Sequence, residues 1–232
     1  MRRQEYLDEL MREYDVVREL SRKTDSVLLL LRHRVLQRDL VVRITGREMP
    51  IADFLKSIVF RHLPEVYDVV HLEDGEVILE EALDGRTLDK LLGERLLSFS
   101  EAKSILSCVA RALTVIHEAG FVHRDIKPKN IMLCEDGTVK LIDFDAARIA
   151  VGTDDTVRLG TAGFAAPEQY VGSSDRRADI FALGVLLNVM LTGKHPSEEL
   201  PKGFRARYIV GKATAMNPEK RYRSAEEFRK AL

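Results

Sequence analysis

The spacing of apolar residues changes near Leu83, and this change restricts the chain to a mixed fold. Before it, residues 15–45 hold three short apolar runs broken by charged turns, Val16-Val17, Val27–Leu31 and Leu40–Val42 with Ile44, which is typical of an antiparallel meander. After it, apolar residues recur at helical spacing. We therefore expect an α+β chain with a strand-rich part over residues 1–82 and a mostly helical part over residues 83–232.

Two helices are expected in the strand-rich part. Tyr6, Leu10 and Tyr14 recur at helical spacing among charges, so residues 3–14 are predicted to form a helix that docks on the sheet. Pro50 suits a first helical turn and is expected to open a helix that runs to about His62. Glu73-Asp74-Gly75 is predicted to be a hairpin turn.

In the second part, residues 88–92 are expected to form a short helix and Ser100 to cap a longer one that ends at Gly120. Residues 146–178 are rich in Gly, Thr, Asp and Ala, with weak periodicity, and are predicted to form a long functional loop. Residues 178–191 are almost wholly apolar, which predicts a central buried helix.

Composition excludes several classes of function. Across 232 residues the formal net charge is −1, so no overall field favours nucleic acid or a membrane surface. The longest strongly apolar run is far too short to cross a bilayer, and the N-terminal residues lack the apolar region of a signal peptide. The two cysteines, Cys108 and Cys134, give no disulfide framework. A cytoplasmic protein without a membrane segment is expected.

The residues that carry chemistry lie in residues 123–130 and shortly after them. Asp125, Lys127 and Asn130 stand close together beside the helix breaker Pro128, and Asp143 follows the next apolar run. Carboxylate and amide oxygens suit Mg²⁺, and a nearby lysine can neutralise phosphate charge. This set therefore indicates Mg²⁺-dependent phosphoryl transfer.

These residues resemble the motifs of eukaryotic-type serine/threonine protein kinases, of the compact kind found in bacteria. The resemblance runs from about Tyr14 to Leu232, and its three ordered motifs are His123-Arg124-Asp125 with Lys127 and Asn130, Asp143-Phe144, and Ala166-Pro167-Glu168. It implies a bilobal protein-kinase-like fold, in which a small antiparallel-sheet N-lobe with one helix and a mostly helical C-lobe form one kinase domain.

The resemblance also implies the roles of the matching residues. Asp125 would accept the proton of the attacking hydroxyl, Lys127 would stabilise the transferred phosphate, and Asn130 and Asp143 would bind Mg²⁺. The cofactors would be ATP and Mg²⁺, and the substrate would be a serine or threonine hydroxyl of a protein.

Other positions match supporting features of the family. Asp179 would anchor the backbone of the catalytic loop, and Arg221 would pair with Glu168. Gly160-Thr161 resembles the loop that receives the substrate hydroxyl. Arg124 could clamp a phosphate on the long loop, where Thr153 and Thr156 are candidate acceptors, although ordinary loop residues would look the same.

Three departures from the family concern the nucleotide. An alignment on Val27 puts Leu20, Arg22 and Asp25 at the three positions of the glycine-rich loop, so no glycine remains there. Arg43 stands at the position of the strand lysine, and Asp53, or less well Glu48, stands at the position of its helix glutamate. Asp145 replaces the glycine of the Asp-Phe-Gly motif, where it could tune a second ion or bond locally.

An adenine pocket is still expected from the resemblance. The residues implied to surround the base, to guard the rear of the pocket or to offer it backbone groups are Val27, Val41, Met132, Leu79, Glu80 and Ala82.

The intact catalytic set favours an atypical serine/threonine protein kinase. The altered nucleotide positions leave open a pseudokinase, which would bind nucleotide or act as a scaffold with little or no transfer. A small-molecule phosphotransferase shares an acid and an asparagine at similar spacing. The amino-acid sequence of residues 123–128 and the Ala166-Pro167-Glu168 segment argue against this class.

Overall fold

The computed structural model describes residues 1–149, 161–171 and 175–232. Within them the chain forms two compact units, Met1–Asp84 and Gly85–Leu232. The predicted division into lobes of residues 1–82 and 83–232 remains a prediction about how the chain folds. Each unit is taken below by itself.

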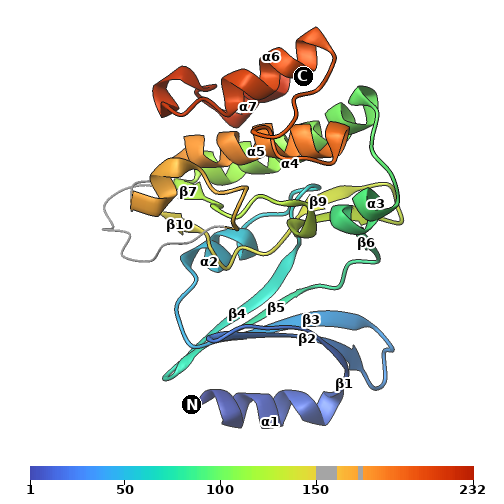
Figure 1. Cartoon of the computed structure of the whole chain (residues 1–232). Helices are drawn as coiled ribbons and strands as arrows, with labels where there is room; N and C mark the ends of the chain where they lie inside the picture. The colour runs from blue at the N-terminus through green and yellow to red at the C-terminus, as the bar shows by residue number, and fades with distance from the viewer. Residues whose placement is uncertain (150–160, 172–174) are drawn as a thin grey trace. The chain divides into compact units, whose positions relative to one another are not determined.

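The first unit is one antiparallel sheet with two helices, one before its first strand and one between its third and fourth strands (Figure 1). The sheet has five strands in the order β1-β2-β3-β5-β4. The elements are α1 (Arg3–Glu13), β1 (Tyr14–Arg22), β2 (Ser26–His33), β3 (Asp39–Thr45), α2 (Pro50–Lys56), β4 (Val66–Leu72) and β5 (Gly75–Glu81). Gly75 makes the β4–β5 turn possible, because it has φ 140° and a Cβ there would lie 2.0 Å from the carbonyl oxygen of Thr45.

Helix α1 covers one face of this sheet, as the spacing of its apolar residues predicted. The buried core of that face is Leu31, Leu40, Val42 and Val77, and the side chains packed against it include Tyr6, Leu7, Leu10, Met11, Tyr14, Leu29, Ile44, Val70, Leu72 and Leu79. Because sheet side chains alternate, residues such as Val41 and Arg43 lie on the opposite face.

The prediction that α2 runs to His62 is wrong, since the helix ends at Lys56. The Ser57 hydroxyl donates to the carbonyl of Phe54 at 2.7 Å, a local bond that competes with further helix. Ile58 and Val59 follow, and β-branched residues extend a helix poorly. Val59 is 82% exposed, so the buried face of α2 does not continue through it.

The second unit is helical, with two small sheets that carry the catalytic loop (Figure 1). Its helices are α3 (Leu88–Glu94), α4 (Phe99–Glu118), α5 (Arg176–Thr192), α6 (Phe204–Ala213) and α7 (Ala225–Ala231). Its strands are β6 (Gly85–Thr87), β7 (Phe121–Val122), β8 (Ile131–Cys134), β9 (Val139–Leu141) and β10 (Arg148–Ile149), and its 3-10 turns are Pro128–Asn130, Pro167–Val171 and Pro218–Lys220.

Helix α4 is capped by Ser98, so the expectation of a cap at Ser100 is wrong. The Ser98 hydroxyl accepts from the N–H of Glu101 at 3.3 Å, and the Glu101 carboxylate accepts from the N–H of Ser98 at 2.8 Å. This is a capping box, which satisfies two N–H groups that the first helical turn leaves without partners. The end of α4 near Gly120, which has φ 84°, agrees with the prediction.

Helix α5 is the buried centre of the second unit, as its apolar composition predicted. Gly184 lets α6 approach, because a Cβ there would lie 2.6 Å from the Cβ of Ala213. The predicted long loop over residues 146–178 is shorter in its described parts, since β10, a 3-10 turn and the start of α5 at Arg176 fall within it.

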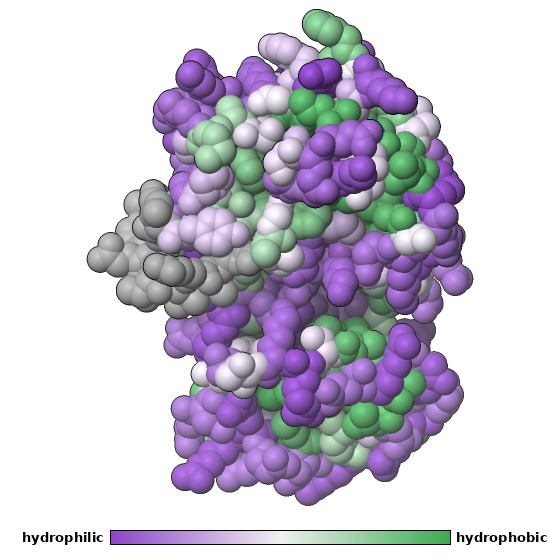
Figure 2. Space-filling model, in the orientation of Figure 1, coloured by the Kyte–Doolittle hydropathy of each residue, from purple (hydrophilic) through white to green (hydrophobic). Residues whose placement is uncertain are grey.

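On the face seen in Figure 2, hydrophilic residues predominate and hydrophobic residues form separate patches. No helix among the described residues is long and apolar enough to cross a membrane.

Candidate functional site

The catalytic loop, His123–Lys127, lies between β7 and the 3-10 turn Pro128–Asn130. Pro128 occupies the first position of that turn, where its missing N–H costs nothing. Strand β8 then pairs with β9, which leads directly to Asp143. A bond from the N–H of Ile142 to the carbonyl of Asn130, 2.9 Å long, holds the end of β9 beside the loop.

The buried carboxylate of Asp179 in α5 holds the backbone of this loop, as the resemblance implied. It accepts from the N–H of His123 at 2.9 Å and from the N–H of Arg124 at 2.8 Å, and His117 binds it at 2.8 Å. Burial alone would raise the pKa of Asp179, but the hydrogen bond to His117, the charge of His117 and the N–H of His123 lower it. Asp179 therefore stays ionised and bonded to the loop.

His123 is fully buried and links the loop to the segment that carries Asp143. Its Nδ1 accepts from the N–H of Asp125 at 3.3 Å, and its Nε2 lies 3.3 Å from the carbonyl of Ile142. The ring of Phe144 packs edge-on against it at 4.9 Å. Burial lowers the pKa of His123, which matches a neutral ring with its proton on Nε2.

The carboxylate of Asp125 is held by three side chains. One oxygen lies 2.6 Å from the ammonium of Lys127 and 3.0 Å from the amide nitrogen of Asn130. The other oxygen accepts from the hydroxyl of Thr161 at 2.7 Å, and Lys127 donates to the same hydroxyl at 2.8 Å. The structure thus brings Asp125, Lys127 and Asn130 together, with a hydroxyl group bonded to the carboxylate.

Asn130 and Asp143 fit the predicted Mg²⁺ site by their chemistry. The amide nitrogen of Asn130 donates to the backbone carbonyl and to the carboxylate of Asp125, which leaves the amide oxygen for a cation. Asp143 has φ 63°, in the left-handed region. Mg²⁺ needs only one or two protein oxygens of this kind besides water and phosphate. No cluster of three or more His, Cys, Asp or Glu side chains suited to a metal occurs in the described ranges.

Asp145 is buried, and its carbonyl accepts from the guanidinium of Arg148 at 3.3 Å. A glycine would offer the same carbonyl, so the role of the Asp145 side chain remains a prediction.

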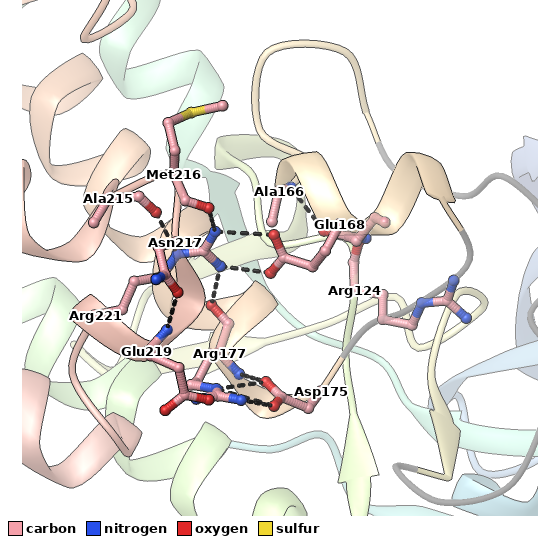
Figure 3. A network of polar contacts seen from close by, with 11 residues as sticks. Arg124, Ala166, Glu168, Asp175, Arg177, Ala215, Met216, Asn217, Glu219 and Arg221 are labelled. Carbon is pink, nitrogen blue, oxygen red and sulfur yellow. Dashed lines mark hydrogen bonds and ion pairs between the residues drawn. The ribbon is translucent and has the colours of Figure 1, made fainter.

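The predicted pair of Glu168 and Arg221 is present (Figure 3). Nη2 of Arg221 lies 2.9 Å from Oε2 of Glu168, and its guanidinium also donates to the carbonyls of Ala215, Arg177 and Met216. Arg177 binds Asp175 and Glu219 in the same network. These contacts fix the end of the Ala166-Pro167-Glu168 segment to α5.

The guanidinium of Arg124 points away from the Arg221–Glu168 pair in Figure 3, and its carbonyl accepts from Gln169 at 3.0 Å. Thr153 and Thr156 lie outside the described residues, as does Gly160. The proposed phosphate clamp of Arg124 therefore remains a prediction.

In the first unit, the predicted nucleotide residues lie on two faces of the sheet. Arg43 lies opposite Ile78, and Val41 opposite Glu80, on the face that α1 leaves uncovered. Val27 lies opposite Ile44 and Leu79 opposite Val42, on the face that α1 covers. Grouping Val27 and Leu79 with Val41 was wrong, because a shift of one residue along a strand moves a side chain to the other face.

The expected pair of Arg43 and Asp53 is also not formed. Asp53 binds Nε2 of His71 at 3.2 Å, while Nε of Arg43 donates to Oε1 of Glu80 at 3.0 Å. The turn between β1 and β2 is tight, with the N–H of Lys23 bonded to the carbonyl of Ser26 at 2.8 Å. That N–H is thus already used, which agrees with the predicted lack of a phosphate-binding glycine loop.

Two residues of the expected adenine pocket, Ala82 and Met132, remain to be placed. Ala82 follows β5, and Met132 lies in β8 opposite Thr87. Sequence reasoning gave no role to the side chains of His123, Glu80 and His71. Only His123 carried a signal, its place at the head of the catalytic motif.

A five-stranded antiparallel sheet followed by a helical unit that carries this loop defines the class of the protein kinases. The sequence profile described as "Protein kinase domain" matches residues 32–230, and the chain belongs to this family.

Curated relatives agree with this assignment. The chain is 34% identical to serine/threonine-protein kinase pkn3 of Myxococcus xanthus, over 93% of this chain and 46% of that protein. It is 32% identical to serine/threonine-protein kinase D of Synechocystis sp., over 73% of this chain and 38% of that protein. It is 40% identical to PknL of Mycobacterium tuberculosis, over 59% of this chain and 35% of that protein. The chain spans less than half the length of each of these relatives.

Proposed function

We propose that this chain transfers the γ-phosphate of MgATP to a serine or threonine hydroxyl of a protein. The observation that carries the proposal is the carboxylate of Asp125, which accepts a hydrogen bond from the hydroxyl of Thr161 at 2.7 Å. The ammonium of Lys127 binds both the carboxylate and this hydroxyl. A carboxylate in this setting can take the proton of an attacking hydroxyl.

The other residues of the second unit have roles that follow from their contacts. Lys127 places positive charge beside Asp125, where it can stabilise charge on the transferred group. Asn130 and Asp143 would hold the metal through amide and carboxylate oxygens, and MgATP would supply the phosphoryl group. Asp179 and His123 keep the loop in the geometry that this chemistry needs.

The pseudokinase remains the second candidate, since the rebuilt nucleotide positions of the first unit favour it. Arg43 in place of the strand lysine and a β1–β2 turn without glycine would weaken nucleotide affinity and orientation more than the chemical step.

The test combines MgATP binding, followed by thermal shift, with an assay of phosphate transfer to protein. We expect binding, and transfer that falls by about 10²–10⁴-fold in Asp125→Asn. Asp143→Asn should weaken the Mg²⁺ dependence of both readouts. Binding without any transfer that depends on Asp125 would support the pseudokinase and refute the kinase.

A further inference from the structure

Arg43 of β3 is buried and bonded to an acid from the neighbouring strand. Its side chain is 5% exposed, that of Glu80 is 16% exposed, and Nε and Oε1 lie 3.0 Å apart. A guanidinium buried to this extent needs a fixed partner, because an isolated buried charge is unstable.

The register of the sheet explains why Glu80 is that partner. Arg43 lies opposite Ile78, and Val41 lies opposite Glu80. Glu80 is therefore the diagonal neighbour of Arg43 on the same face, within reach of a long side chain. Strands β3 and β5 are hydrogen-bonded along their length, so the two side chains start from a rigid backbone.

Helix α2, which the kinase resemblance makes the source of the acid, supplies no carboxylate to Arg43. Asp53 binds His71 on β4, at 3.2 Å. Glu48 precedes the helix and is exposed, and the described residues offer its carboxylate no hydrogen bond or ion pair. His71 also binds the buried Glu76, at 2.8 Å, which ties α2 to the sheet without Arg43.

We propose that Glu80 is the positioning residue that orients Arg43 toward the nucleotide phosphates, so that this clamp is set within the sheet and not by α2. The inference rests on the proposed function in one respect, the use of MgATP. It implies that the Arg43–Glu80 pair does not depend on a movement of α2, because both of its members belong to adjacent strands.

The experiment compares Kd for MgATP, thermal stability and phosphate transfer in matched variants. Glu80→Gln keeps the size of the side chain and removes its charge, and it should raise Kd for MgATP about tenfold. Arg43→Gln should raise Kd at least as much. Glu80→Asp keeps the charge on a shorter side chain and should give an intermediate Kd, which keeps the test decisive if Glu80→Gln folds poorly.

The matched control is Asp39→Asn. Asp39 pairs with Arg32 across β2 and β3 of the same sheet, at 2.6 Å, away from Arg43. This variant should change Kd for MgATP less than twofold. The exchanged pair Arg43→Glu/Glu80→Arg should recover thermal stability but not nucleotide affinity, since a guanidinium would then start from the wrong strand.

Two results would overturn the inference. Glu80→Gln could lower thermal stability and leave Kd unchanged, which is the behaviour of a purely structural pair. Alternatively, Asp53→Asn could raise Kd as much as Glu80→Gln, which would make α2 the source of the orientation. A wild-type chain that binds MgATP without transferring phosphate refutes only the kinase function, because the Kd comparison still decides the role of Glu80. A wild-type chain that does not bind MgATP refutes both.

Discussion

Arg221 and Glu168 form an ion pair that joins two parts of the second unit far apart in sequence. The guanidinium is wholly buried, and it also donates to three backbone carbonyls. Removal of one partner leaves an uncompensated charge in the interior, which typically costs about 3–5 kcal/mol.

We therefore expect Glu168→Gln to lower the free energy of unfolding by about 3 kcal/mol, at the lower end of that range because the carbonyl partners remain. Urea denaturation measures the change. Glu226→Gln is the control, since its pair with Arg229 is more exposed and should give a much smaller shift. Equal shifts in the two variants would contradict the prediction.

His123 and His71 should contribute to stability with opposite pH dependence. Burial lowers the pKa of His123 below 6.5, so the unfolded chain binds more protons than the folded one below that value. Stability from His123 is then lost as the pH falls. Bonds to Glu76 and then Asp53 raise the pKa of His71, so its contribution is present at low pH and is lost as the pH rises through the folded pKa.

Urea midpoints of His123→Gln and His71→Gln between about pH 5 and 8 test both signs. His123→Gln should reduce the loss of stability on the acid side, and His71→Gln should make that loss steeper. An unchanged slope in His123→Gln would show that its protonation is not linked to folding.

The cap of α4 should be energetically distinct from the serine two residues later. Ser98→Ala removes the acceptor for the N–H of Glu101 and should cost about 1 kcal/mol in chemical denaturation. Ser100→Ala is the matched control and should change stability little, because only the backbone carbonyl of Ser100 takes part in a described bond, with Ser104. A larger loss of stability in Ser100→Ala than in Ser98→Ala would instead support Ser100 as the cap of α4.

The hydroxyl of Thr161 should matter for turnover more than for nucleotide affinity, given the proposed kinase function. Thr161→Val removes the bonds to Asp125 and Lys127 and should lower kcat by about tenfold, which corresponds to about 1.4 kcal/mol of lost transition-state stabilisation. Thr161→Ser keeps the hydroxyl and should stay near wild type. A rise in Kd for MgATP with kcat unchanged would rule out a positioning role at Asp125.

Local rules predicted much of the fold. The docking helix α1, the three-strand meander, the β4–β5 hairpin and the buried helix α5 follow from periodicity and turn residues, which act over a few neighbours. The errors at the end of α2 and at the cap of α4 concern element boundaries. There a single side-chain bond, from Ser57 or from Ser98, decides the outcome.

The proposed catalytic set of Asp125, Lys127, Asn130 and Asp143 could be named from the sequence because it lies within two short motifs. The nucleotide-facing residues of the first unit could not be chosen in the same way. Both β2 and β5 contain continuous apolar runs, which carry no alternation to show which residue faces α1.

The sequence by itself determined the order of the elements, the kinase motifs and the loss of the glycine loop, since each depends on residues that are close in the chain. Only the tertiary structure decided that Val27 and Leu79 face α1, that Asp53 binds His71 and that Arg43 binds Glu80. Those contacts depend on strand register, and a shift of one residue reverses every side chain along a strand.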